Sequence, residues 1–197
     1  MNLPLRRFGR TNLKIPILSL GGMRFQKSWN HLDFSEISLK EQNKVENILN
    51  LACKYGLNHI ETALHYGTSE MQLGHALKIY HEDSIILQTK IPPNPNIELF
   101  KENLKTSFEN LRVKKIDLIA IHGLNNEEHL YQSIRDGGCV DVLKQYQKDG
   151  LIGHIGFSTH GKLSLIKSAI SSNKFDYVNL HWYFINQNNI SAIKLAK

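Results

Sequence analysis

Short apolar runs alternate along the chain with stretches in which apolar residues recur at helical spacing. The runs lie at residues 15–20, 57–60, 85–87, 116–121, 153–157 and 177–180. They are nearly continuous in Val, Ile, Leu and Phe, which favours strands buried on both faces. Residues 3–14, with a turn near 9–12, predict a hairpin ahead of the first of these strands.

The segments between the runs carry the signals of amphipathic helices. Capping residues precede three of them, at Ser38 with Glu41, at Ser69 with Gln72 and at Asn96. Apolar residues at helical spacing follow around 45–52, 73–77, 100–111, 140–146 and 163–170. Gly56 and Gly150 end two of these stretches, and a further helix is predicted from about 188 onward.

Alternation of strand and helix predicts a parallel sheet covered by helices, either a doubly wound open sheet or a (β/α)8 barrel. A dinucleotide-binding open sheet carries G-x-G-x-x-G after its first strand. The first run here ends in Gly21-Gly22-Met23-Arg24, with no third glycine in place. We therefore expect a (β/α)8 TIM barrel, truncated after about six βα units, with residues 1–197 as one domain.

Composition and charge narrow the function. Apolar residues make up 41% of the 197 positions, which excludes disordered and coiled-coil classes. No apolar run approaches a membrane span, and residues 1–10 lack the apolar core of a signal peptide. The two cysteines, Cys53 and Cys139, are too few for a disulfide scaffold, so we expect a cytoplasmic protein. The net charge of +6 is scattered rather than clustered, which argues against nucleic acid and suits a phosphorylated ligand.

Candidate catalytic side chains follow successive strands. Glu61 and Tyr66 come after the second run, Lys90 after the third and His122 after the fourth. A barrel brings these strand ends to one rim. Each residue alone is more often structural than catalytic. Together, a tyrosine beside a lysine ammonium, a carboxylate to hold that ammonium and a histidine suit protonation of an oxygen while hydride arrives from a cofactor.

The ten histidines raise a metal-dependent alternative. His59 with His65 and His154 with His160 are the candidate ligand pairs. Each pair is six residues apart across a strand–loop junction, and neither is accompanied by a second carboxylate. This spacing is unlike that of known metal motifs, so we expect no metal site.

Four stretches of sequence carry a resemblance to a known family. They are FGRTNLKIP followed by LSLGG within 8–22, GLNHIETA through YG, SE and LG within 56–74, VKKIDLIAIH at 113–122 and GLIGHIGFST at 150–159. In this order they resemble the aldo-keto reductase family over nearly the whole chain. The resemblance implies reduction of an aldehyde or ketone to an alcohol with NADPH.

The resemblance also implies residue roles. Tyr66 would donate the proton to the substrate carbonyl, Lys90 would promote that donation and His122 would orient the carbonyl. Glu61 stands where the family usually has aspartate. Residues implied to bind the cofactor are Gly22, Met23, Glu61, Ser158, Thr159 and Asn179; Thr159 replaces an asparagine and Asn179 a glutamine. Trp29, His31 and Trp182 are candidates for the pocket mouth or for packing.

In that family the seventh and eighth units hold most of the adenosine phosphate and pyrophosphate of the cofactor. Two hypotheses therefore stay open. One is an NADPH-dependent carbonyl reductase acting on a small-molecule carbonyl. The other is a truncated, catalytically inactive protein of the same fold, or a binding subunit. In both, we expect open barrel edges that favour self-association.

Overall fold

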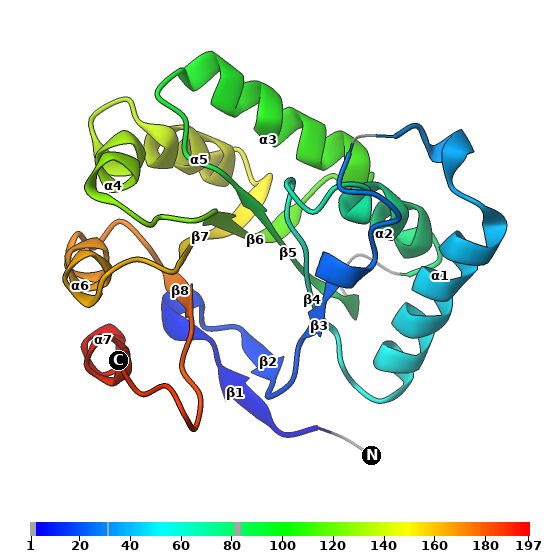
Figure 1. Ribbon diagram of the computed structural model, residues 1–197, viewed down its shortest axis with the longest axis horizontal. Coiled ribbons are helices and arrows are strands. Elements are labelled where there is room, and N and C mark those ends of the chain that lie inside the picture. The colour runs from blue at the N-terminus through cyan, green and yellow to red at the C-terminus, as the bar shows by residue number, and fades with distance from the viewer. Residues whose placement is uncertain (1–2, 31, 81–83) are drawn as a thin grey trace.

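The computed structural model describes residues 3–30, 32–80 and 84–197, and its centre is a curled sheet of parallel strands (Figure 1). Each strand pairs with the next one along the chain. In this order the strands are β3 (Leu20–Gly21), β4 (His59–Glu61), β5 (Ile86–Ile91), β6 (Ile116–Ile121), β7 (Ile152–Thr159) and β8 (Tyr177–Leu180). Parallel neighbours in sequence order place every strand's carboxyl end on the same side, as the sequence predicts.

Helices cover the outer face of this sheet (Figure 1). They are α1 (Leu39–Lys54), α2 (Ser69–Leu77), α3 (Ile97–Leu111), α4 (Glu127–Ile134), α5 (Cys139–Lys148), α6 (Leu163–Ser171) and α7 (Ile190–Ala196). The capping box of Ser38 and Glu41 begins α1, and the Asn96 side chain accepts from two backbone N–H groups of α3. The short helix α4 was not predicted, although Asn126 caps it by accepting from the His129 N–H.

The hairpin predicted in residues 3–14 forms, but the first apolar run is divided between two structures. Strands β1 (Leu5–Arg7) and β2 (Lys14–Pro16) pair antiparallel around a 3₁₀ turn. This pairing takes up the first half of the run 15–20, and Ile17 and Leu18 are 53% and 55% exposed. The prediction of one strand over 15–20 is therefore wrong, because only the last residue of the run reaches the parallel sheet.

Two strands extend beyond the apolar runs that indicate them. β5 reaches residue 91 and β7 residue 159, whereas the runs end at 87 and 157. The added residues include polar side chains such as Lys90 and Ser158, which interrupt the apolar pattern although they belong to strands. A strand with polar side chains on one face is therefore longer than the apolar run from which it is predicted.

The predicted cap at Ser69 is also wrong. Thr68 occupies the N-cap of α2, and Ser69 is the first helical residue. The Ser69 hydroxyl is buried; it donates to the Gly22 carbonyl at 2.7 Å and lies 2.8 Å from the Thr62 hydroxyl. Its role is to join the ends of β3 and β4 to α2.

The sheet has two edges, β3 and β8, so the described strands curl through part of a barrel and do not close one. The main core lies between sheet and helices and includes Leu104, Ile119 and Phe157. On the inner face Tyr177 packs with Phe8 of the hairpin. The hairpin therefore covers the end of the sheet opposite the strand carboxyl ends. No helix in the described ranges is long and apolar enough to cross a bilayer.

Candidate active site

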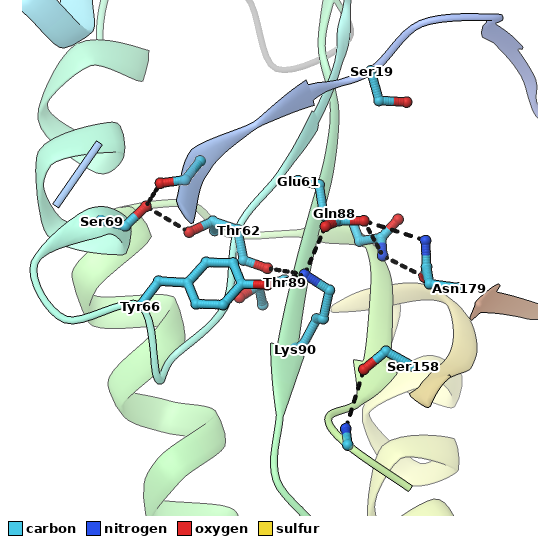
Figure 2. Close-up of polar contacts among 12 residues, drawn as sticks. Ser19, Glu61, Thr62, Tyr66, Ser69, Gln88, Thr89, Lys90, Ser158 and Asn179 are labelled. Carbon is cyan, nitrogen blue, oxygen red and sulfur yellow. Dashed lines mark hydrogen bonds and ion pairs between the residues drawn. The ribbon is translucent and has the colours of Figure 1, made fainter. Parts of the chain in front are cut away.

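The Lys90 ammonium occupies the centre of the candidate site (Figure 2). Its Nζ donates to Glu61 Oε1 at 2.7 Å, to the Thr62 carbonyl oxygen at 3.1 Å and to Tyr66 Oη at 3.2 Å. The same Nζ lies 4.7 Å from the centroid of the Tyr66 ring. With the Lys90 side chain 4% exposed, this charge is compensated by protein groups rather than by water.

The local fold explains how these side chains meet. Lys90 is on the inner face of β5, and Glu61 ends β4, whose register places it beside Gln88. Tyr66 lies in the turn after β4, where its N–H donates to the Ala63 carbonyl at 3.0 Å. Gly67 has φ +54°, and a Cβ there would lie 1.9 Å from the Ser28 carbonyl oxygen. Only glycine fits this turn, which brings the tyrosine back over the strand ends.

The second oxygen of Glu61 is also bound. Its Oε2 accepts from Asn179 Nδ2 at 3.2 Å and from Gln88 Nε2 at 3.4 Å. The sequence predicts no role for Gln88, which is fully buried. The available signal was its position two residues before Lys90, since alternate residues of a strand share a face.

His122 follows β6 and faces Tyr66 with its ring edge. The two ring centroids are 5.7 Å apart and the rings are nearly perpendicular, at 87°. Burial, with help from Lys90 and the neighbouring histidines His65 and His160, lowers the pKa of His122 to about 4. The imidazole is therefore neutral at physiological pH. Its Nδ1 is buried and has no hydrogen-bond partner among the residues that the structure describes.

Two of the residues predicted to bind a cofactor lie on the same inner face as Lys90. Ser158 and Asn179 are register partners on β7 and β8, so their side chains share the inner face. Ser158 Oγ accepts from the Gly123 N–H at 3.1 Å, which leaves its own proton to donate. Thr159, by contrast, is buried; its hydroxyl donates to the Leu124 carbonyl at 2.6 Å and accepts from the Gly161 N–H at 2.9 Å.

Gly22 and Met23 form the first part of a 3₁₀ turn after β3. A Cβ on Gly22 would lie 3.0 Å from both the Glu61 carbonyl oxygen and Ser69 Oγ. The backbone here thus passes close to the strand ends, and the Met23 side chain is 40% exposed beside it. Gly22 is buried at this point, and the use of Gly22 and Met23 by a cofactor stays a prediction.

In one of the histidine pairs considered as metal ligands, both rings contact other side chains. His154 lies 3.6 Å from Asp176, and the His160 ring packs on that of His181. Across the described ranges, no three or more His, Cys, Asp or Glu side chains form a cluster suited to a metal ion. At the predicted pocket mouth, Trp29 and Trp182 are 59% and 46% exposed, while His31 lies outside the described residues.

Comparison with protein families gives one decisive match. The model of the aldo/keto reductase family matches residues 17–194. The chain belongs to the aldo/keto reductase family. This match spans all six strands of the parallel sheet and the side chains of Glu61, Tyr66, Lys90 and His122.

A curated relative of the chain is described as an oxidoreductase. It is an uncharacterized oxidoreductase, YqkF, of Bacillus subtilis, 29% identical over 147 residues. That alignment covers 65% of this chain and 46% of the relative. The chain therefore spans about half the length of the relative that it matches.

Solved aldo-keto reductases share the fold. A putative aldo-keto reductase from Pseudomonas aeruginosa superimposes with a TM-score of 0.79 at 22% identity, over 98% of this chain and 73% of that one. A holo-form aldo-keto reductase from Bacillus halodurans gives 0.72 at 21%, over 92% and 58%. A Bombyx mori aldo-keto reductase in complex with NADP gives 0.65 at 18%, over 92% and 59%.

Proposed function

We propose that this chain is an NADPH-dependent reductase that converts a small aldehyde or ketone to an alcohol. The observation that carries the proposal is the Lys90 ammonium held between the Glu61 carboxylate and the Tyr66 hydroxyl. This arrangement suits a proton donor whose anion must be stabilised after donation. Family membership and the NADP-bound structure of a relative support the choice of cofactor.

In this mechanism the proton moves from Tyr66 Oη to the substrate oxygen. Lys90 Nζ lies 3.2 Å from Tyr66 Oη and stabilises the phenolate that remains. Glu61 holds the ammonium in place. Neutral His122, edge-on to Tyr66, orients the carbonyl oxygen by a hydrogen bond. A charged imidazolium would be repelled by the Lys90 ammonium. The lowered pKa of His122 keeps the ring neutral and therefore suits this role.

The cofactor residues fit a nicotinamide group. When bound, NADPH supplies the hydride that reduces the carbonyl carbon. The Ser158 hydroxyl and the Asn179 amide carry donors and acceptors that would match a carboxamide, and Gly22 and Met23, in the turn after β3, would hold the cofactor with them. Thr159 acts by fixing the loop through its bond to Leu124, which places Ser158.

A fluorescence titration of the full 197-residue chain with NADPH is the first test. We expect saturable binding at micromolar concentration and NADPH consumption with at least one member of an aldehyde panel. The free thiols Cys53 and Cys139 suit the reducing cytoplasm in which we place this reaction, so reductant is kept in the buffer.

Two substitutions then test the roles. Tyr66→Phe and Lys90→Met should each lower kcat by about 10²- to 10⁴-fold, the range of lost acid–base catalysis. Both should keep the wild-type circular dichroism and NADPH affinity. The matched controls are Tyr131→Phe on the exposed face of α4 and Lys101→Met in an exposed α3 ion pair. Wild-type turnover in Tyr66→Phe would refute the assignment of the proton donor.

The second candidate is a non-catalytic binding subunit of the same fold, and it predicts no NADPH binding up to millimolar concentration. Micromolar binding would exclude it.

A further inference from the structure

A chain of hydrogen bonds runs along the inner face of the sheet toward the candidate site, and Figure 2 shows its last part, among Gln88, Asn179, Glu61 and Lys90. Ser19 Oγ lies 2.7 Å from His59 Nδ1, and His59 Nε2 lies 3.1 Å from Gln88 Oε1. The Gln88 Nε2 then donates to Asn179 Oδ1 at 2.8 Å and to Glu61 Oε2 at 3.4 Å. Glu61 continues the chain to Lys90. His59 and Gln88 are 2% and 0% exposed, so water does not compete for these bonds.

The carboxylate at one end of this chain of hydrogen bonds decides which group donates and which accepts in each bond. Glu61, as a carboxylate, only accepts, so Gln88 must present its NH₂ to it and its carbonyl oxygen to His59. His59 must therefore carry its proton on Nε2, and its Nδ1 must accept from the Ser19 hydroxyl. Burial also lowers the pKa of His59, which favours this neutral ring. The opposite tautomer would turn the Gln88 oxygen toward Glu61, and two acceptors would then face each other.

We propose that Gln88 is a positioning residue for the reaction, which holds the Glu61 carboxylate against Lys90 and is itself oriented by His59 in its Nε2–H tautomer. This inference rests on the proposed function for its catalytic consequence. Gln88 and Asn179 bind the same oxygen, Oε2, and leave Oε1 for Lys90. One carboxylate oxygen is thus fixed by two amides, and the other directs the ammonium to Tyr66.

Substitution of Gln88 tests the catalytic part. Gln88→Met keeps the length of the side chain and removes its donor, and we expect kcat to fall about 10- to 100-fold, with KM for NADPH nearly unchanged. Gln88→Glu replaces the donor with an acceptor beside Glu61 and should lower kcat further. The matched control is Gln42→Met, a buried glutamine between α1 and α2 whose amide donates to Glu46 and to the Gln72 carbonyl.

A double-substitution cycle separates positioning from packing. Glu61→Asp withdraws the carboxylate by one methylene, so adding Gln88→Met to it should cost much less than in the wild type. Equal losses in both backgrounds would show that Gln88 acts only through packing and would overturn the proposal.

Nitrogen-15 NMR of the cofactor-free full chain gives a readout that does not depend on turnover. We expect His59 to show the Nε2–H tautomer, and the Gln88 side-chain amide resonances to move on Glu61→Gln. Loss of the Gln88 carbonyl in Gln88→Met should convert His59 to a tautomer mixture. A predominant Nδ1–H tautomer in the wild type, or Gln88 resonances unmoved by Glu61→Gln, would overturn the proposal. A chain that shows the expected NMR but no turnover would refute the proposed function alone.

Discussion

His122 is a neutral ring because its surroundings cannot support a charge. It is mostly buried, and the charged group that affects it most, Lys90, has the same sign that the imidazolium would carry. These causes act together, burial first, to lower its pKa from the usual 6.5 to about 4. The same residue therefore links the catalytic geometry to the acid stability of the chain.

This shift sets a pH dependence of stability. Between about pH 6.5 and 4 the unfolded chain binds a proton at this histidine that the folded chain does not bind. The free energy of unfolding should thus fall as pH decreases through that window, by up to about 1.4 kcal/mol per pH unit. His122→Gln should lose this contribution. Urea unfolding of both proteins at several pH values measures the difference; parallel curves would contradict the buried, neutral ring.

Single residues also show how far sequence reasoning reaches. Glu61, Tyr66 and Lys90 meet as predicted, because parallel strands bring their carboxyl ends together whatever the details of packing. Gln88 was missed because its role depends on Asn179, 91 residues further along the chain. The position of Gln88 two residues before Lys90 indicates the face that it shares, but its role follows only when its partner on another strand is known.

At the scale of elements, the close packing of α2 against α3 rests on one glycine. A Cβ on Gly74 would lie 2.1 Å from the Asn110 carbonyl oxygen and 2.7 Å from the Leu111 carbonyl carbon. Both are backbone atoms and cannot turn aside as a flexible side chain could. The two helices therefore approach at a distance that any larger residue would prevent.

Gly74→Ala should consequently destabilise the fold, by about 1–3 kcal/mol, as overpacking does elsewhere. Chemical denaturation measures the loss. Gly21→Ala is the control, since nothing lies within 4 Å of its added Cβ. A variant as stable as the wild type would mean that α2 and α3 separate at little cost.

Elements as a whole were more predictable than their ends. Caps such as Ser38 and Asn96 are local in sequence, and both helices begin where these residues indicate. The start of β3 depends on pairing between β1 and β2. The Ser69 hydroxyl donates a hydrogen bond to the carbonyl of Gly22, 47 residues away. Boundaries set by distant partners leave no mark in the neighbouring sequence.

At the scale of the molecule, the two sheet edges and the apolar segment after β8 provide surface for self-association. Phe184 and Ile185 are 94% and 87% exposed. Sedimentation velocity should show association that increases with protein concentration, because exposed strand edges and apolar patches pair with each other. The double substitution Phe184→Ser with Ile185→Ser should reduce it. A monomer at all concentrations, or identical behaviour of the variant, would contradict this expectation.

The strand order of the sheet has a consequence for the time course of folding. Because each strand pairs with its successor, every βα unit can dock on the preceding one as the chain leaves the ribosome, with short loops to close. The hairpin is the exception. Its turn bonds through the Arg10 N–H to the Asp176 carbonyl oxygen, and Phe8 packs on Tyr177. The hairpin, which precedes β3 in the chain, must therefore wait for β8 before it can take its final position.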